Sequence, residues 1–561
     1  MGHFKLLYLF FKQNILLIFV YILFTLLSYP LQSVVIPHIY SNFFNAITKN
    51  KTKAIFIKYI TLLIIIFAIT NASNYLTAYY ESFIFPKLND FILNYLYKNL
   101  LIKYENNYEE LELGKIINSL IFIPNNLKSI INEFCKIAFP RGMTIAVINI
   151  YFFYINWKLG LVSLFILIIL LIFNLYFVDS CSDISKNRHN EYDNQNQYIQ
   201  DRLSNLTSIY AFGNISFEIT SFKDILKKYY LLFNNDLKCM VKSTMITSIL
   251  IVILFIALNG LSAYLYFKKE ISYVTLLSLF IMVIYYYPCI TEINDSLPEF
   301  MQYYGSIKQL DNFVTDLCNV NDNHENNNYL QNKNRCKMNY ADINIKNLNF
   351  KYPSTNKFLF NNFNLKINHF DKIAITGPSG NGKSTLIKLI MGYYEVPDNT
   401  IFIDNNDINS YNLSDLRKKI SYVNQNTKLF NKSVLQNIQY GNDMTRKDII
   451  KLCKKIGIEK IFENLDDGLD TMVGINGDKL SGGQRQMINI LRCIGLKNKI
   501  VILDEPTSAI DTVNTSAVIK GLEEISKDCT LILITHDSDI LHLANRIIEL
   551  NNGVIMKDIK K

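Results

Sequence analysis

The sequence ITGPSGNGKSTL, residues Ile375 to Leu386, contains the pattern G-x-x-x-x-G-K-S/T between Gly377 and Ser384 and follows a short apolar run. This pattern is typical of a loop that binds the phosphates of a nucleoside triphosphate. Its glycines let backbone N–H groups turn inward around an anion, and the helix that follows offers its positive N-terminus. Lys383 is expected to reach the β- and γ-phosphates, and Ser384 to ligate Mg²⁺. The expected ATP contacts in this segment are Gly377, Pro378, Ser379, Gly380, Asn381, Gly382, Lys383, Ser384 and Thr385.

Two adjacent carboxylates, Asp504 and Glu505, follow the apolar run Ile500 to Leu503, which is predicted to be a strand. Ligands of open parallel sheets bind at the carboxyl ends of the strands, so both side chains are expected beside the phosphates. Asp504 suits a contact with the metal, and Glu505 suits a general base that orients water. The alternative is a pair of exposed turn acids. The four apolar β-formers directly before them favour the functional pair, beside the expected ATP and Mg²⁺, over exposed turn acids.

The segment LSGGQ, Leu480 to Gln484, resembles the signature that distinguishes ABC ATPases from other phosphate-loop proteins. The sequence also resembles this family at Tyr352 (an adenine-stacking aromatic), Gln425 (the Q-loop), Asp511 (the D-loop) and His536 (a switch histidine). Taken singly, Tyr352 could pack in the core, His536 could be a satisfied buried histidine, and Gln425 could be a surface amide. Their order and spacing around the stronger motifs favour the ABC interpretation.

The resemblance implies a head-to-tail dimer in which ATP on the phosphate loop of one chain is capped by the signature of the other. The residues that would cap it are Ser481, Gly482, Gly483 and Gln484. The resemblance also implies catalytic roles for Glu505, His536 and Lys383, and metal contacts from Ser384, Gln425 and Asp504. Because one chain holds the whole set, a homodimer with two competent sites is the simplest expectation, and a heterodimer stays open.

Upstream of these motifs the chain is strongly apolar. Of its 561 residues 50% are hydrophobic and only 19% are charged, and the mean hydropathy is +0.13, more apolar than a soluble protein of this size needs. Six runs are nearly free of charge, and each is near the ~20 residues that a helix needs to cross a bilayer. They lie at about 14–36, 54–81, 137–155, 158–178, 245–267 and 272–291. The first run is too long for a signal peptide and is expected to be the first span.

The remaining stretches predict how the domains are organised. Long inner segments at about 82–136 and 179–244 have helical composition and are expected to project from the membrane as arms. We predict a transmembrane domain over 1–318, a polar linker over 319–340 and an ATP-binding domain over 341–561. The predicted fold is an α-helical membrane domain with six spans, which resembles the exporter type, followed by an α/β phosphate-loop ABC ATPase domain. An even number of spans and the ATP chemistry predict a multi-pass membrane protein with this second domain on the cytosolic or matrix side, and they do not identify the membrane.

The expected function is ATP-driven export of an unidentified solute by an alternating-access dimer of half-transporters. The alternatives are an ATP-gated channel or regulator with an ABC fold, and an ABC ATPase that takes no part in transport. One departure from the exporter pattern concerns the contact between domains, because Met472 and Ile475 stand where exporters usually have glutamates before the signature.

Composition also limits the expected partners. The net charge of +9 could suggest nucleic acid, but no long Lys/Arg run is present, so we expect a second half-transporter chain, membrane lipid and the solute, and no nucleic acid. The nine cysteines form no C-x-x-C pair and are expected to be reduced thiols. Polar residues inside the spans, such as Asn149 and Tyr286, are expected to face the bundle interior, either as interhelical hydrogen bonds or as a cavity lining.

Overall fold

The computed structural model describes residues 2–31, 35–48, 53–106, 113–326, 340–353, 355–425, 428–507 and 512–561. The chain divides into two compact units. The helical unit comprises Met1–Lys103 and Leu111–Asn323, and the ATPase unit comprises Tyr104–Glu110 and His324–Lys561. Each unit is described separately.

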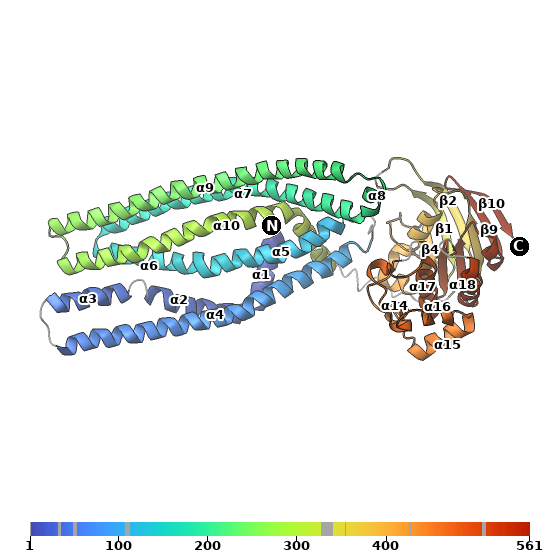
Figure 1. Cartoon of the computed structure of the whole chain (residues 1–561), viewed down its shortest axis with the longest axis horizontal. Helices are drawn as coiled ribbons and strands as arrows, with labels where there is room; N and C mark the ends of the chain where they lie inside the picture. Colours follow the sequence, from blue (N-terminus) through green and yellow to red (C-terminus); the bar gives the residue numbers. More distant parts are fainter. Residues whose placement is uncertain are drawn as a thin grey trace. The chain divides into compact units, whose positions relative to one another are not determined.

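The helical unit consists of long helices (Figure 1). Its elements are α1 (Gly2–Gln13), α2 (Ile15–Pro30), α3 (Ile36–Thr48), α4 (Lys53–Lys103), α5 (Leu113–Glu133), the π-helix η3 (Phe134–Ala138), α6 (Phe139–Ile155), α7 (Trp157–Ser204), α8 (Leu206–Ala211), α9 (Ile215–Phe267) and α10 (Tyr273–Asn326). The helices α7, α9 and α10 run side by side, and α8 forms the short turn between α7 and α9. Helix α10 continues into the stretch that the sequence predicts as a linker.

Within the described residues, five helical stretches are long and apolar enough to span a membrane: α4, Ile116–Ile155, α7, α9 and the segment Tyr273–Asn319 of α10. They contain four of the last five predicted spans, and Tyr273–Asn319 contains all but the first residue of the remaining one, 272–291. Helix α1 and the first part of α2 meet at 89° and add a sixth span if they form one broken segment. The predicted inner arms are continuous with these helices, since α7 and α9 extend well beyond 158–178 and 245–267.

An apolar core holds α6, α7, α9 and α10 together. Phe152, Leu170 and Leu258 are buried in it around Tyr286, which is 1% exposed. The Tyr286 hydroxyl is 2.8 Å from Asn149 Nδ2, which donates to it, and 2.8 Å from Ser163 Oγ. These polar groups of the spans therefore form interhelical hydrogen bonds, the first of the two roles expected for them.

The expectation that the cysteines are reduced thiols is wrong for Cys181 on α7 and Cys239 on α9, which form a disulfide. The two residues are 58 positions apart in sequence, and the packing of α7 against α9 brings their Cα atoms within 5.7 Å. Sequence spacing could not reveal this pair because it depends on how two separate helices meet. The other cysteines that the structure describes are not disulfide-bonded.

The ATPase unit is built on two sheets. A four-stranded antiparallel sheet has the order β2-β1-β4-β5, and a six-stranded sheet has the order β10-β9-β3-β8-β7-β6, in which only β10 is antiparallel to its neighbour. The strands are β1 (Ile343–Phe350), β2 (Phe360–Ile367), β3 (Lys372–Thr376), β4 (Ile401–Ile403), β5 (Asn406–Asp407), β6 (Ile420–Val423), β7 (Ile500–Asp504), β8 (Thr530–Ile534), β9 (Arg546–Asn551) and β10 (Val554–Lys560).

Helices cover the parallel strands, and for this reason β7 and β8 are buried along their whole length. The helical segments are α12 (Lys383–Ile390), η4 (Ile408–Ser410), α13 (Leu413–Arg417), α14 (Val434–Ile438), α15 (Arg446–Ile456), α16 (Glu459–Glu463), η5 (Gly468–Asp470), η6 (Ile475–Gly477), α17 (Gly482–Leu496), α18 (Thr512–Ile525) and η7 (Ser538–Leu543). One core lies against α12 and the four-stranded sheet, and a second lies against α14 to α18. This α/β architecture matches the prediction for the second domain.

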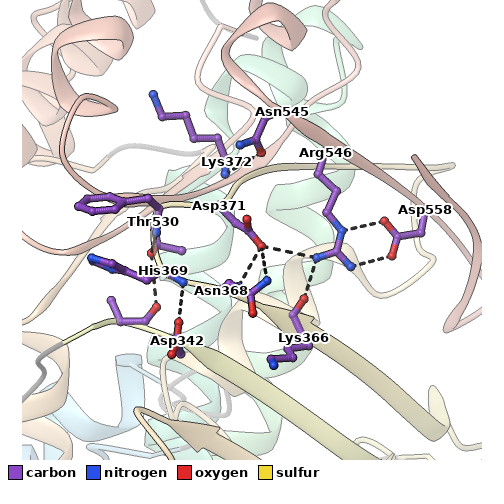
Figure 2. Close-up of polar contacts among 12 residues, drawn as sticks. Asp342, Lys366, Asn368, His369, Asp371, Lys372, Thr530, Asn545, Arg546 and Asp558 are labelled. Carbon is purple, nitrogen blue, oxygen red and sulfur yellow. Dashed lines mark hydrogen bonds and ion pairs between the residues drawn. The ribbon is translucent and has the colours of Figure 1, made fainter. Parts of the chain in front are cut away.

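Polar contacts gather at the amino end of β3 (Figure 2). The Arg546 guanidinium donates to both carboxylate oxygens of Asp558, at 2.7 and 2.6 Å, and to the Lys366 carbonyl at 2.7 Å. Asp371 lies 3.7 Å from the same guanidinium. Asn545 Oδ1 accepts from the Lys372 N–H at 3.0 Å. These contacts join β2, β3, β9 and β10 at the edge opposite the phosphate loop.

Candidate ATP site

The phosphate loop connects β3 to α12. Its backbone takes positive φ values at Gly377 (132°) and Gly382 (95°). A Cβ atom at Gly377 would lie 2.0 Å from the Leu550 carbonyl oxygen, and one at Gly382 would lie 2.9 Å from the ring of Phe360. Both positions therefore require glycine for conformation and for space. The close approach of Leu550 and Phe360 therefore confines the backbone of the loop.

Lys383, at the start of α12, turns back over this loop. Its Nζ donates to the carbonyl oxygens of Gly377, at 2.5 Å, and Pro378, at 3.0 Å. Burial lowers the pKa of Lys383, while the charges of Glu505 and Asp504 oppose this effect. The ammonium group is thus positioned at the loop, where an incoming phosphate would replace carbonyl oxygens as its partner.

Asp504 ends β7 and is 4% exposed. Burial raises the pKa of its carboxyl, a hydrogen bond from the Ser384 side chain lowers it, and the nearby charge of Glu505 raises it. Ser384 and Asp504 therefore lie side by side, although 120 residues separate them in sequence. A hydroxyl and a carboxylate are the hard oxygen ligands that Mg²⁺ prefers, so these two residues fit the expected metal contact.

Glu505 adopts an uncommon backbone conformation at the same edge. Its φ is +47°, and its N–H donates to the Ile534 carbonyl on β8 at 2.9 Å. A non-glycine residue in this region costs about 1–3 kcal/mol, and such strain gathers at functional sites. Gln425 Nε2 donates to Glu505 Oε2 at 2.6 Å, which brings the predicted Q-loop residue to the predicted base.

Tyr352 lies between the core and the phosphate loop. Its hydroxyl is 2.6 Å from the Thr385 hydroxyl, and its ring packs edge-on against Phe350 and Tyr394. The side chain is half-buried. Core packing, the alternative interpretation of this residue, therefore accounts for its contacts with Phe350 and Tyr394 but does not bury the side chain completely.

The signature segment begins α17. Ser481 is the N-cap of this helix: its Oγ accepts from the Gln484 N–H at 3.2 Å, and the Ser481 N–H is bonded to Gln484 Oε1 at 2.9 Å. This reciprocal capping box fixes the helix start. Ser481 is exposed, and Gly482 and Gly483 follow it in the first turn of the helix. A hydroxyl and a positive helix N-terminus are thus presented at the surface.

Comparisons with known proteins agree with this geometry. The family model described as ABC transporter matches residues 360–508, and the model described as ABC transporter transmembrane region matches residues 15–287. The chain belongs to the ABC transporter family. It is an exporter-type half-transporter, in which an α-helical membrane domain precedes an α/β ATPase domain, as the sequence predicted.

Relatives of this transporter cover nearly its whole length. A Rickettsia bellii protein, whose name places it among export ATP-binding/permease proteins, is 28% identical over 97% of this chain and 93% of its own. An ATP-dependent lipid A-core flippase of Pseudoalteromonas translucida is 26% identical over 91% of this chain and 87% of its own. The structure of a bacterial Atm1-family ABC exporter with ATP bound has the same fold, with a TM-score of 0.81 at 19% identity, and covers 98% of this chain and 95% of its own.

The structure describes only one of the two remaining predicted site residues, His536 and Asp511. His536 comes two positions after Ile534, to which Glu505 is bonded, and is exposed, so the alternative of a buried histidine does not describe it. Asp511 lies outside the described residues.

The segment before the signature is at the surface: Met472 is 49% exposed and Ile475 is 69% exposed.

Sequence reasoning missed one neighbour of the phosphate loop, Asn551 at the end of β9. Its Oδ1 accepts from Asn381 Nδ2 at 3.1 Å. The same strand presents the Leu550 carbonyl to Gly377. No local motif marks these positions; only the pairing of β9 with β3 brings them to the loop.

Proposed function

We propose that two copies of this half-transporter form a dimer that exports a solute by alternating access, driven by two ATP molecules. The observation that carries the proposal is the convergence of Lys383, Ser384, Asp504, Glu505 and Gln425 at one sheet edge, on a chain that also presents an exposed signature. A hydroxyl and N–H groups at a helix start suit the γ-phosphate of an ATP held by a partner. Each dimer would then contain two equivalent sites.

The residues of one site have distinct proposed roles. The loop N–H groups and Lys383 bind the phosphates, and the accessible part of the Tyr352 ring stacks on adenine. Ser384 and Asp504, with Gln425, would hold Mg²⁺, which supplies neutralisation of the phosphate charge when bound. Glu505 accepts the proton of the attacking water, and its bond to Gln425 fixes the direction of its carboxylate. His536 interacts with the γ-phosphate from the end of β8, and Asp511 acts in the D-loop between the two chains.

The long helices would connect this chemistry to the membrane. Helices α7 and α9 continue without a break from the predicted spans into the arms. A rigid helix transmits a displacement along its whole length, at 1.5 Å per residue, as a loop cannot. We propose that closing the ATPase dimer moves these arms on the cytosolic side and turns the membrane cavity outward, and that hydrolysis resets it.

Complementation between inactive chains tests the dimer directly. Lys383→Ala inactivates the phosphate loop and leaves the signature intact, whereas Ser481→Arg blocks the signature and leaves the loop intact. Each variant alone is expected to lack ATPase activity. Co-expressed in equal amounts, they should recover about a quarter of wild-type ATPase turnover, because half of the dimers are mixed and each mixed dimer has one complete site. The measurement is phosphate release by purified, reconstituted protein.

Two further samples complete this experiment. Lys383→Ala mixed with a Lys383→Ala, Ser481→Arg double variant is the matched control and should stay inactive. If the complementing pair also stays inactive although both chains co-purify, the shared site is refuted. Uptake of fluorescent lipid and amphipathic solutes into inside-out vesicles then tests export, and ATP turnover without movement of any solute would favour the regulator alternative.

A further inference from the structure

One apolar cluster of the helical unit contains four sulfur-bearing side chains. Cys181 on α7, Cys239 and Met240 on α9, and Met301 on α10 belong to one apolar cluster. Cys181 and Met301 are fully buried, and Met240 is 3% exposed. Both cysteines lie a few residues beyond the inner ends of the predicted spans 158–178 and 245–267, in the segments predicted as arms. None of these residues takes part in the proposed ATPase chemistry.

The helix packing holds the two cysteines together without the disulfide. One turn from Cys181, the Ser185 hydroxyl donates to both oxygens of Asp236, at 2.7 and 2.9 Å. Arg188, one turn further, lies 3.1 Å from Asp236 in a buried ion pair. These contacts fix the register of α7 against α9. Reduction of the disulfide would therefore leave two thiols side by side in a formed site.

The methionines bring α10 into the same cluster. Gln302 Nε2 on α10 donates a hydrogen bond to the Met240 sulfur at 3.4 Å. This thioether therefore points toward the helix that carries Met301. The disulfide alone does not explain why two methionines belong to the same cluster, because a disulfide does not require a neighbouring thioether. Thiolate and thioether ligands together select soft cations, above all Cu(I). Among the described residues, no group of three or more His, Cys, Asp or Glu side chains could hold a metal ion, so a site at these two cysteines depends on the thioethers for its further ligands.

We propose that the thiol form of this cluster binds one Cu(I) ion, with Cys181 and Cys239 as thiolate ligands and thioether donation from Met240 and Met301. Reduction of the disulfide takes two electrons from a phosphine, which takes up the oxygen of one water molecule to become the phosphine oxide, and two protons from that water, and it yields two thiols. Binding of Cu(I) then releases both thiol protons and forms two copper–thiolate bonds, which the thioether sulfur atoms supplement, with no further electron transfer. The arms are proposed to be cytosolic, where cysteines are kept reduced, so the binding form is the one expected there.

Metal competition on the full-length protein in detergent tests this site without reference to transport. The protein is reduced with a phosphine, freed of reductant under nitrogen and titrated with Cu(I) against bicinchoninate. Wild-type protein is expected to retain one equivalent of Cu(I), and X-ray absorption should show a first shell of sulfur only. Cys181→Ser and Cys239→Ser should lose retention. Met240→Leu and Met301→Leu conserve side-chain volume and should weaken binding roughly tenfold.

Three controls make the result decisive. Cys289→Ser removes a buried free cysteine of α10 outside the cluster and should leave Cu(I) uptake unchanged. Wild-type protein with the disulfide closed should bind no Cu(I). ATPase activity and elution volume confirm that each variant is folded. Failure of folded, reduced wild-type protein to compete for Cu(I), retention of the ion by Cys181→Ser, or preference for Zn²⁺ would each overturn the proposal.

Discussion

The two ends of strand β3 are built in opposite ways. At its carboxyl end lies the phosphate loop, with positive φ at glycines and a lysine whose pKa is lowered by burial, and near that lysine is Glu505, which follows β7 in a strained backbone conformation. At its amino end, Arg546 satisfies Asp558 and the Lys366 carbonyl with hydrogen bonds (Figure 2). The charged groups at the carboxyl end therefore lie where the proposed ligand binds, and those at the amino end join neighbouring strands. The difference teaches that similar side chains serve chemistry or stability according to which partners the fold supplies.

The largest expected effect concerns the carboxyl end. Glu505→Gln should lower ATPase turnover roughly 10²- to 10⁴-fold, because it removes the base that accepts the proton of water. ATP binding should persist, since the phosphate loop is unchanged. Phosphate release and nucleotide binding by the reconstituted protein measure both effects. Glu463→Gln, an exposed position on α16, is the matched control. Equal turnover in the two variants would contradict the role given to Glu505.

A change at the amino end should act on stability instead. Arg546→Met leaves Asp558 and Asp371 without their shared cation and should destabilise the local structure by about 2 kcal/mol, the range for hydrogen bonds to charged groups. Amide hydrogen exchange of β9 and β10 should then be roughly 30-fold faster, while ATP affinity changes little. Lys557→Met, which removes an exposed ion pair with Glu549, should alter exchange much less. Unchanged exchange in Arg546→Met would refute this contrast.

The pH dependence of the two ends should have opposite signs. The hydrogen bond from Arg546 lowers the pKa of Asp558, so its stabilisation is present above the unfolded pKa and is lost as pH falls through the folded value. Burial raises the pKa of Asp504, so its ionised form costs stability, and acid relieves this cost.

Hydrogen exchange between pH 6 and 3, corrected for the intrinsic rates, should accordingly show falling protection at β9–β10 and no such fall at β7. Arg546→Met should abolish the first trend, and Asp504→Asn should abolish any pH-dependent gain at β7. If protection at β7 fell with pH in the same way as at β9–β10, the opposite pKa shifts of Asp504 and Asp558 would be contradicted.

The smallest expected effect concerns the hydrogen bond between Asn381 in the phosphate loop and Asn551 at the end of β9. Asn381→Ala removes the hydrogen bond to Asn551, which is worth about 0.5–1 kcal/mol at an exposed site. The KM for ATP should rise roughly two- to fivefold with kcat preserved. Asn551→Ala should do the same, and the double variant should be no worse than either single one. Additive losses would mean that the two residues act separately.

Much of the architecture could be predicted because its signals are local. The phosphate loop, the acids after β7 and the LSGGQ segment are short runs whose chemistry depends on adjacent residues. The lengths of the apolar runs follow from the thickness of a bilayer, and the predicted strand Ile500 to Leu503 corresponds to β7. Roles of single site residues stay predictions, since order along a chain indicates which edge they reach and not what they bind.

The sequence by itself determined the family, the order of its two domains and the residue types available for ATP chemistry. Only the tertiary structure decided which distant groups meet: Gln425 with Glu505, Asn381 with Asn551, Arg546 with Asp558, and Cys181 with Cys239. The physical reason is that these contacts depend on strand order and on helix packing. Both are set by burial of apolar surface across the whole unit, and no local pattern of residues encodes them.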